Sequence, residues 1–250
     1  MPMLHSNDAE IHWKQTGSGP PVVLVHGFGE SAERMWEKSG WVESLESAGR
    51  RVVRFDLRGH GLSEKIYDPV VYHIDRLTAD LANVVREADA TGAHFVGFSL
   101  GSEILFRYLL KGGARDAVGA VFIGMGRVVL RPRRRATALS VEAMSAEDTA
   151  QLHPALQKLR RIHEGRGNDL RALIALLRAE LERVALEPDE MRDLALPVLF
   201  VAGENEQVVG DVEPIADLVK GSRIVRIPGT DHDATPLAAE TRAAVLDFLS

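Results

Sequence analysis

Short apolar runs, bounded by glycine, proline or charged residues, alternate along this chain with longer segments of helical period. Strands buried on both faces give such continuous apolar runs, and the helices that connect them give the longer amphipathic segments. The alternation therefore predicts an α/β fold with a mostly parallel central sheet flanked by helices. The predicted strands are Val22 to Val25, Val52 to Phe55, His94 to Phe98, Val118 to Ile123, Val198 to Val201 and Ile224 to Ile227.

The segment before these runs has a different pattern. Glu10 to Thr16 alternates apolar and polar side chains and then meets the turn sequence from Gly17 to Pro21. This predicts an antiparallel hairpin strand at the edge of the sheet. Apolar stripes at helical spacing predict helices that cover the sheet, around Leu77 to Ala88, Ile104 to Leu109 and Thr241 to Leu249.

One region breaks the alternation, because Arg127 to Leu194 contains segments of helical period and no strand candidate. We expect an inserted helical cap at residues 127–194, with residues 1–126 and 195–250 forming the core. The strongest predicted helix in the cap has Asn168 as its N-cap and runs to Val184.

Composition limits the kinds of partner. The chain has 250 residues, a formal net charge of −6 and no cysteine, which excludes a thiolate nucleophile, a disulfide and a cysteine zinc site. An acidic chain has no overall basic field for nucleic acid, so we expect a small-molecule substrate. No apolar stretch reaches the roughly 18 residues of a membrane span and the start lacks a signal-peptide pattern, so we expect no stable membrane insertion and a cytoplasmic location. The sequence does not determine the oligomeric state.

The motif that points to chemistry is Gly97-Phe98-Ser99-Leu100-Gly101, which joins an apolar strand to a helix. In isolation a Gly-x-Ser-x-Gly sequence is also typical of a plain glycine-rich turn. With the strand before it and the helix after it, the segment resembles the α/β-hydrolase family, in which this serine is the nucleophile on a strained turn. The resemblance implies that Ser99 attacks the substrate.

A serine hydroxyl needs a base to take its proton and an acid to orient that base. The family order is nucleophile, acid, histidine, and this implies Glu206 after a late strand and His232 after the last one. The family most often has aspartate at the acid position, so Asp211 and Glu204 stay open as rivals to Glu206.

The segment His26-Gly27-Phe28-Gly29 is similar to the family's oxyanion loop. The resemblance implies that the backbone N–H groups of Phe28 and Leu100 hold the oxyanion, and that His26 braces the turn. We expect Phe28, Phe98, Leu100 and Met125 to line the substrate pocket.

A fourth match lies between Phe55 and Ser63, where Asp56 and the glycines are expected to set loop geometry. The chain departs from many relatives at Ser102-Glu103, where they carry a glycine pair. Glu103 is expected either to be a buried hydrogen-bonding group or to be solvated. The arginines between Arg127 and Arg135 favour a solvated linker, with attraction of an anionic substrate or lipid as the alternative.

These patterns predict a serine hydrolase that cleaves the ester-like bond of a small, largely apolar substrate through an acyl-enzyme on Ser99. Alternatives within the same fold are a carbon–carbon bond hydrolase, an enol-lactone hydrolase and a cofactor-free perhydrolase; a non-catalytic receptor is a more distant one. No cofactor is expected. His153 and His163 lack a carboxylate pattern around them, so no metal site is expected either.

Overall fold

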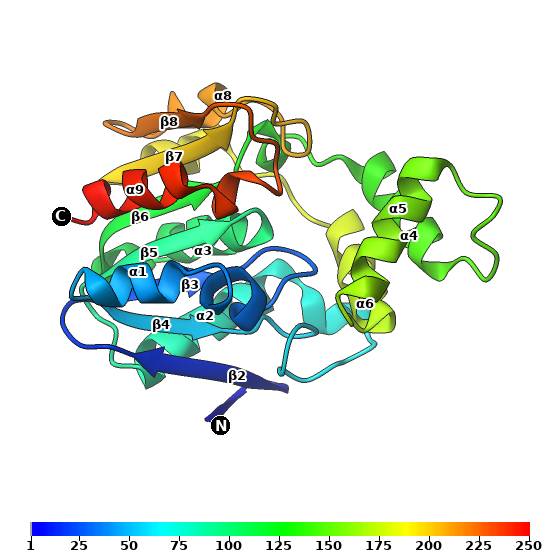
Figure 1. The fold of residues 1–250 in the computed structure, drawn as a ribbon, viewed down its shortest axis with the longest axis horizontal. Coiled ribbons are helices and arrows are strands. Elements are labelled where there is room, and N and C mark those ends of the chain that lie inside the picture. Colours follow the sequence, from blue (N-terminus) through cyan, green and yellow to red (C-terminus); the bar gives the residue numbers. More distant parts are fainter. Residues whose placement is uncertain (1) are drawn as a thin grey trace.

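The computed structural model describes residues 2–250, which form an eight-stranded sheet with helices on both faces (Figure 1). The strand order is β1-β2-β4-β3-β5-β6-β7-β8, and every neighbouring pair from β4 to β8 in this order is parallel. The predicted α/β class with a mostly parallel sheet is confirmed. The strands are β1 (Met3–Ser6), β2 (Ala9–Thr16), β3 (Pro21–Val25), β4 (Arg51–Phe55), β5 (Ala93–Phe98), β6 (Ala117–Ile123), β7 (Val198–Gly203) and β8 (Arg223–Ile227).

The central strands are buried on both faces, as their unbroken apolar runs predict. Alternate side chains enter two separate hydrophobic clusters: Val23 and Val25 of β3 join one, and Val22 and Leu24 join the other. The first cluster lies under α2 (Ile74–Glu87), α3 (Leu100–Leu110) and α8 (Glu213–Ala216). The second lies under α1 (Trp41–Ser47) and α9 (Ala239–Phe248). The two-residue period of a strand thus supplies both layers of the core.

The edge of the sheet differs from the prediction. β2 is antiparallel as expected, but it pairs with β4 on one side and with β1 on the other, so β1 is the edge strand. The hairpin joins β1 to β2 across Asn7 and Asp8, where Asn7 has a φ of 56°. Asparagine accepts this left-handed conformation better than most residues, which explains the tight turn there.

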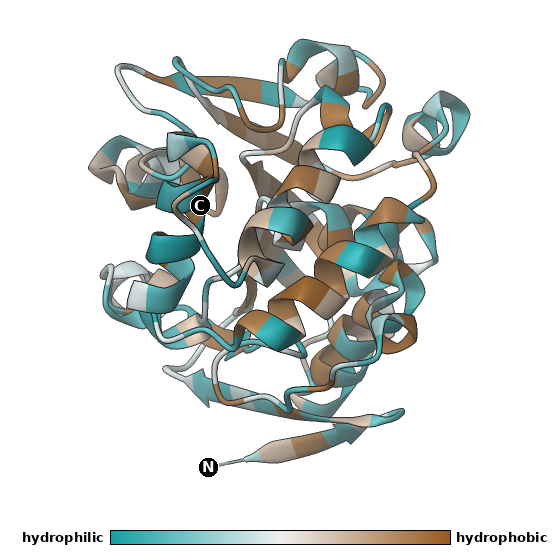
Figure 2. Cartoon of the chain, turned by 90° about the vertical axis from the view of Figure 1, so that its right-hand side faces the viewer, coloured by the Kyte–Doolittle hydropathy of each residue, from teal (hydrophilic) through white to brown (hydrophobic). Residues whose placement is uncertain are grey.

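Between β6 and β7 the described residues contain helices and no strand. We refer to the three longest helices, α4 (Arg134–Ser145), α5 (Pro154–Gly165) and α6 (Leu170–Leu181), as the α4–α6 layer. The short α7 (Pro188–Arg192) follows. The layer lies beside the body formed by the sheet and its flanking helices (Figure 1). Its helices carry both hydrophilic and hydrophobic residues, as the view onto this side shows (Figure 2).

The predicted start and end of α6 are each corrected. The N-cap is Asp169, whose carboxylate accepts hydrogen bonds from the N–H groups of Arg171 and Ala172. Asn168 instead donates from its side chain to the carbonyl of Gly29, 2.8 Å away. The helix ends at Leu181, and Val184 lies beyond it with 67% of its surface exposed. Two adjacent residues that can both act as caps make such a boundary ambiguous in sequence.

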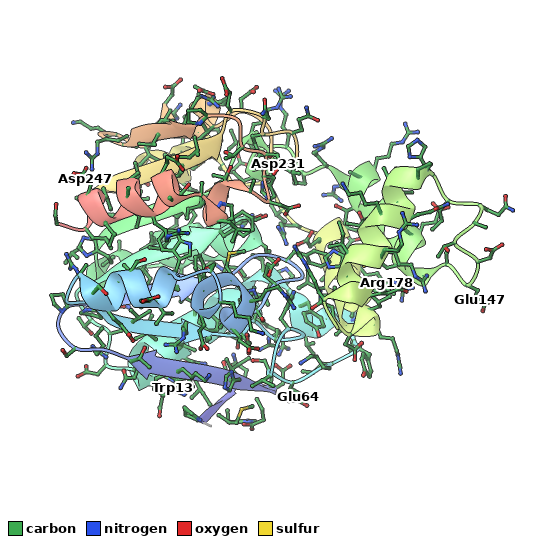
Figure 3. All side chains as sticks on the ribbon, in the orientation of Figure 1. Trp13, Glu64, Glu147, Arg178, Asp231 and Asp247 are labelled. Atoms are coloured by element: carbon green, nitrogen blue, oxygen red, sulfur yellow. The ribbon has the colours of Figure 1, made fainter. Side chains whose placement is uncertain are left out.

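The loops that matter most for chemistry follow the carboxyl ends of the parallel strands. β3, β5, β7 and β8 end at Val25, Phe98, Gly203 and Ile227, and parallel strands end at the same edge of a sheet. Asp231, in the loop after β8, lies at the side of the sheet body that faces the α4–α6 layer (Figure 3). No helix among residues 2–250 is long and apolar enough to cross a membrane.

Candidate active site

Ser99 occupies a strained turn between β5 and α3. Its φ is 53°, a left-handed value that costs energy in a residue with a side chain, and its N–H donates to the carbonyl of Ile123 at 2.9 Å. The flanking glycines are needed for close packing. A Cβ atom at Gly97 would lie 2.7 Å from the Cα of Ser102, and one at Gly101 would lie 2.3 Å from the carbonyl oxygen of Val25. The Gly-x-Ser-x-Gly sequence therefore folds into a turn that presents the serine hydroxyl.

The structure brings together Ser99, His232 and Glu206, which the sequence places 133 and 26 residues apart. The distance from Ser99 Oγ to His232 Nε2 is 2.9 Å, and that from His232 Nδ1 to Glu206 Oε2 is 2.7 Å. An ionised carboxylate only accepts hydrogen bonds, so Nδ1 carries the proton and Nε2 accepts from the serine hydroxyl. This is the orientation in which a histidine can take the proton of a serine.

Glu206 is held in place by more than the histidine. Its Oε1 accepts the N–H groups of Val208 at 2.7 Å and Val209 at 3.1 Å, and only 5% of its side chain is exposed. Burial by itself raises the pKa of this carboxyl. The hydrogen bond and positive charge of His232, with the two backbone N–H groups, outweigh burial and lower the pKa of Glu206 below its ordinary value. The acid is thus kept ionised.

The rival acids lie elsewhere. Asp211 is 67% exposed and pairs with Arg127 at 3.8 Å. Glu204 accepts a hydrogen bond from the N–H of Gly229 at 2.8 Å, and Asp231 accepts one from a backbone N–H in its own loop. Within residues 2–250 none of these three carboxylates forms a hydrogen bond with His232, so Glu206 is the acid that the geometry favours.

The loop after β3 carries the predicted oxyanion donors. No hydrogen bond within the described chain uses the N–H of Phe28 or that of Leu100, the first residue of α3. Two buried histidines brace this loop. His26 donates from Nδ1 to the Gly27 carbonyl at 2.8 Å and accepts the Leu57 N–H at 3.0 Å.

The second brace is His60, which accepts the N–H of Gly29 at 3.0 Å. Burial lowers the pKa of His60 to about 3, and burial also lowers the pKa of His26. Both rings are therefore neutral near pH 7, and both of their nitrogens are used in fixing the loop. This arrangement favours the bracing role expected for His26.

Comparisons with known proteins agree with the fold and with these motifs. Residues 20–126 match a family model described as alpha/beta hydrolase fold. An esterase from Exiguobacterium antarcticum has a TM-score of 0.80 over 99% of this chain and 97% of that one, at 21% identity. The chain therefore has the α/β-hydrolase fold.

Two curated relatives extend the comparison. The chain is 26% identical to a non-heme haloperoxidase of Rhodococcus erythropolis, over 100% of its own length and 99% of that protein. It is 31% identical to a non-heme chloroperoxidase of Kitasatospora aureofaciens over 49% of its own length and 43% of that protein. For several curated relatives the match thus spans less than half of their length.

A cavity of about 450 Å³ opens beside Ser99, between the sheet body and the α4–α6 layer. Its walls are mainly apolar, and three of the four predicted pocket residues, Phe28, Leu100 and Met125, lie among them. The remaining apolar residues of the wall are Val128, Val129, Pro132, Ala136, Leu159, Leu177, Val208 and Val209.

The fourth predicted pocket residue, Phe98, does not line the cavity and is a correction. Phe98 ends β5 and points into the cluster under α1 and α9, and its ring lies 5.0 Å from that of His232 between centroids. The strand period that places Phe95 on one face of the sheet places Phe98 on the other. Its contact is with the histidine.

An ion pair in the cavity wall, between Glu103 and Arg183, is one feature that the sequence did not predict. Glu103 on α3 is 5% exposed, and it pairs with Arg107 at 3.1 Å and with Arg183 at 2.5 Å. Arg183 also pairs with Glu180 of α6 at 2.5 Å. Glu103 had been expected either to be buried or to be solvated, and it is buried. Its partner lies 80 residues away in the chain, so no local pattern indicates the pair.

The α4–α6 layer also contacts the loop that carries Phe28. His163, at the end of α5, packs edge-to-face on the ring of Phe28 with 5.2 Å between centroids. Asn168 bonds both His163 and the Gly29 carbonyl. Arg166 pairs with the buried Glu30 at 2.5 Å. These contacts join the segment from α5 to the start of α6 to the loop after β3.

The arginines near the start of this segment are in part hydrogen-bonded. Arg133 donates to the carbonyls of Gln207 and Val208, and Arg134 donates to that of Leu181. His153 caps α5 by accepting the N–H of Ala155. Among residues 2–250 no group of three or more histidine or acidic side chains is arranged to hold a metal ion.

Proposed function

We propose that this chain is a serine hydrolase that cleaves the carboxylic ester or lactone bond of a small, largely apolar substrate. The observation that carries the proposal is the continuous line of hydrogen bonds from Ser99 through His232 to Glu206. The line ends at a mainly apolar cavity of about 450 Å³, which has the size range of small-molecule sites.

The reaction begins when His232 takes the proton of the Ser99 hydroxyl and the serine oxygen attacks the carbonyl carbon of the substrate. The carbonyl oxygen becomes an oxyanion. His232 then gives its proton to the leaving alcohol oxygen as the carbon–oxygen bond breaks, which leaves an acyl group on Ser99. Water, deprotonated by the same histidine, attacks this ester and restores the serine.

The oxyanion is stabilised by the N–H groups of Phe28 and Leu100, which no other group of the described chain uses. The Leu100 N–H belongs to the first turn of α3, where the helix dipole also favours negative charge. Each such donor is worth about 3 kcal/mol of transition-state stabilisation in a preorganised site.

We further propose that residues 127–194 act as a helical cap on a core made of residues 1–126 and 195–250. The cavity receives Leu159 and Leu177 from the α4–α6 layer and Ser99, Leu100 and Met125 from the sheet body. A substrate held there is enclosed from both sides, so the shape of the layer selects among substrates.

A second candidate function is favoured by the match to the Rhodococcus haloperoxidase over the whole chain. In that reaction hydrogen peroxide, in place of water, attacks the acyl group on Ser99. The products are a peracid and the free serine, and the peracid then oxidises a halide ion in solution. Carbon–carbon bond and enol-lactone cleavage stay predictions from the family resemblance.

The deciding experiment is turnover of p-nitrophenyl esters, from acetate to long acyl chains, by the wild type and by Ser99→Ala. We expect wild-type turnover with an optimum chain length and a loss of about 10⁴-fold in the variant. The peroxide reaction is measured separately by bromination of a dye with acetate, bromide and hydrogen peroxide.

Each other outcome points to a different reading. Labelling of Ser99 by a fluorophosphonate without ester turnover contradicts ester cleavage and moves carbon–carbon substrates forward. Ligand binding that survives Ser99→Ala, with no labelling of the wild type, indicates a non-catalytic receptor.

A further inference from the structure

The wall of the mainly apolar cavity holds four charged residues, Arg133, Glu103, Glu180 and Arg183, and we call the last three the charged trio. Glu103 lies on α3, four residues after Ser99, which is about 6 Å along a helix. Glu180 and Arg183 lie at the end of α6 and just after it. The trio therefore forms part of the wall a short distance from the serine.

The trio carries one net negative charge, which the neighbouring Arg107 balances. Arg183 bridges the two glutamates at 2.5 Å each, and Arg107 pairs with the other oxygen of Glu103 at 3.1 Å. Two carboxylates thus face two guanidinium groups. Burial raises the pKa of Glu180, which is consistent with a poorly solvated site. An additional ion placed here would be left without a counter-charge.

The trio is not balanced in hydrogen bonds. Both oxygens of Glu103 are used, but Glu180 uses only Oε1, and within residues 2–250 no group donates to its Oε2. Arg183 donates from Nη1 and Nη2 to the glutamates, and its Nε–H makes no hydrogen bond in the same part of the chain. Two cavity-lining residues therefore each have one unused hydrogen-bonding atom, the acceptor Glu180 Oε2 and the donor Arg183 Nε.

A purely hydrocarbon substrate would cover this acceptor and donor without replacing the water that satisfies them, which is unfavourable. A carboxylate or an ammonium group would satisfy one of them but would disturb the charge balance. A neutral group that both donates and accepts, such as a hydroxyl, satisfies both at once.

We propose that the substrate is a hydroxyl-bearing ester or lactone whose hydroxyl lies between Glu180 Oε2 and Arg183 Nε while its carbonyl meets Ser99. The remainder of the substrate occupies the apolar wall formed by Leu100, Met125 and Leu177. This inference rests on the proposed ester hydrolysis and adds the class of substrate to it. The trio determines specificity and takes no part in the acyl transfer.

The test compares two p-nitrophenyl esters of equal size, one with a terminal hydroxyl on its acyl chain and one with a methyl group in its place. The two esters are compared at each acyl-chain length from four to ten carbons. The readout is the ratio of their kcat/KM values. We expect the wild type to favour the hydroxyl ester by about tenfold or more at one chain length.

Two variants and one control then locate the preference. Glu180→Leu should bring the ratio to about one or below, while Glu180→Gln, which keeps a hydrogen-bonding oxygen, should retain most of it. Glu182→Gln changes an exposed glutamate at the end of the same helix and should leave the ratio and the basal rate unchanged. Thermal unfolding shows whether the Glu180→Leu variant folds. If that variant does not fold, the kcat/KM ratios of the wild type and of Glu180→Gln still test the proposal.

A wild-type ratio near one at every chain length would overturn the inference, as would a ratio that Glu180→Leu leaves unchanged. Faster turnover of an ester ending in a carboxylate or an ammonium group would overturn it too. In these cases the esters are still hydrolysed, so the proposed function stands. Absence of turnover of both esters, without fluorophosphonate labelling of Ser99, overturns the proposed function and the inference together.

Discussion

Two buried histidine–carboxylate pairs in this protein are nearly alike. His232 Nδ1 lies 2.7 Å from Glu206, and His12 Nδ1 lies 3.1 Å from Asp56. In each pair less than a tenth of either side chain is exposed. The difference is at the far nitrogen. His232 Nε2 contacts the Ser99 hydroxyl, whereas His12 Nε2 is buried and has no hydrogen-bond partner within residues 2–250.

This difference teaches that a histidine oriented by an acid is not by itself a sign of catalysis. Asp56 also accepts the N–H groups of Ala32 at 2.7 Å and Leu62 at 2.9 Å, so it ties two loops to β2. Glu206 accepts two N–H groups from its own loop only. Both acids fix backbone, and both follow a parallel strand, but only the histidine beside Glu206 contacts a nucleophile.

The largest difference between the two pairs is expected when the nucleophile beside His232 is removed. Ser99→Ala should lower kcat/KM for an ester by about 10⁴-fold or more, because His232 then has no hydroxyl to activate. The free energy of unfolding should change little, because alanine keeps the Cβ atom of serine and the only side-chain hydrogen bond lost within residues 2–250 is that to His232. Ester kinetics and urea unfolding measure the two quantities. Activity within tenfold of wild type would show that another residue is the nucleophile.

The second largest effect is expected from Glu206, the acid beside His232. Glu206→Gln should lower kcat/KM by about 10³-fold, because an amide no longer favours the Nδ1–H tautomer or stabilises the protonated ring. Asp211→Asn serves as the control, since Asp211 is 67% exposed and pairs only with Arg127 among the described residues, and it should change the rate less than threefold. The opposite ranking of these two variants would move the acid to Asp211.

The acid of the other pair should act on stability. Asp56→Asn places an NH₂ group or a single oxygen where three donors now converge, and buried donors without partners are costly. We expect a loss of about 3 kcal/mol in the free energy of unfolding, with ester turnover by the folded fraction reduced far less than in Glu206→Gln. Urea titrations at pH 7 measure the loss. A change below about 0.5 kcal/mol would mean that the loops do not depend on Asp56.

The pH dependence of that loss can be predicted in sign. Burial raises the pKa of Asp56, but the nearby His26 and the N–H groups of Leu62 and Ala32 outweigh it and lower the pKa below the ordinary 3.8. A lowered folded-state pKa contributes stability that is present above the ordinary value and is lost as the pH falls through the folded-state value. The stability gap between wild type and Asp56→Asn should therefore narrow as the pH falls below about 4. Urea titrations from pH 6 to pH 3 give this gap, and a constant gap would contradict the assignment.

Much of the fold was predictable because the central strands are buried on both faces. The run from Val22 to Val25 is fully buried, so its composition alone indicates a strand. β1 was missed because an edge strand pairs on one side only, and its Met3 to Ser6 sequence has no continuous apolar run.

The candidate site, like the fold, has residues that the sequence indicates and residues that it does not. The family resemblance was enough to propose Ser99, Glu206 and His232, because each lies in a local turn after a strand, and such turns can be found in the sequence. The charged trio was not predictable, since Glu103 and Arg183 are 80 residues apart and meet only when the α4–α6 layer packs against the sheet body. Phe98 was misplaced because a neighbour of the nucleophile in sequence points to the opposite face of the sheet.

The smallest expected effect completes the comparison of the two histidines. His12→Asn keeps an N–H donor at the position of Nδ1 and removes only the ring with its unpartnered Nε2. We expect kcat/KM to change less than threefold and the free energy of unfolding to change by about 1 kcal/mol. The identical replacement His232→Asn should abolish turnover, because the nitrogen that accepts the serine proton is lost. Similar losses from both replacements would mean that His12 acts on the reaction.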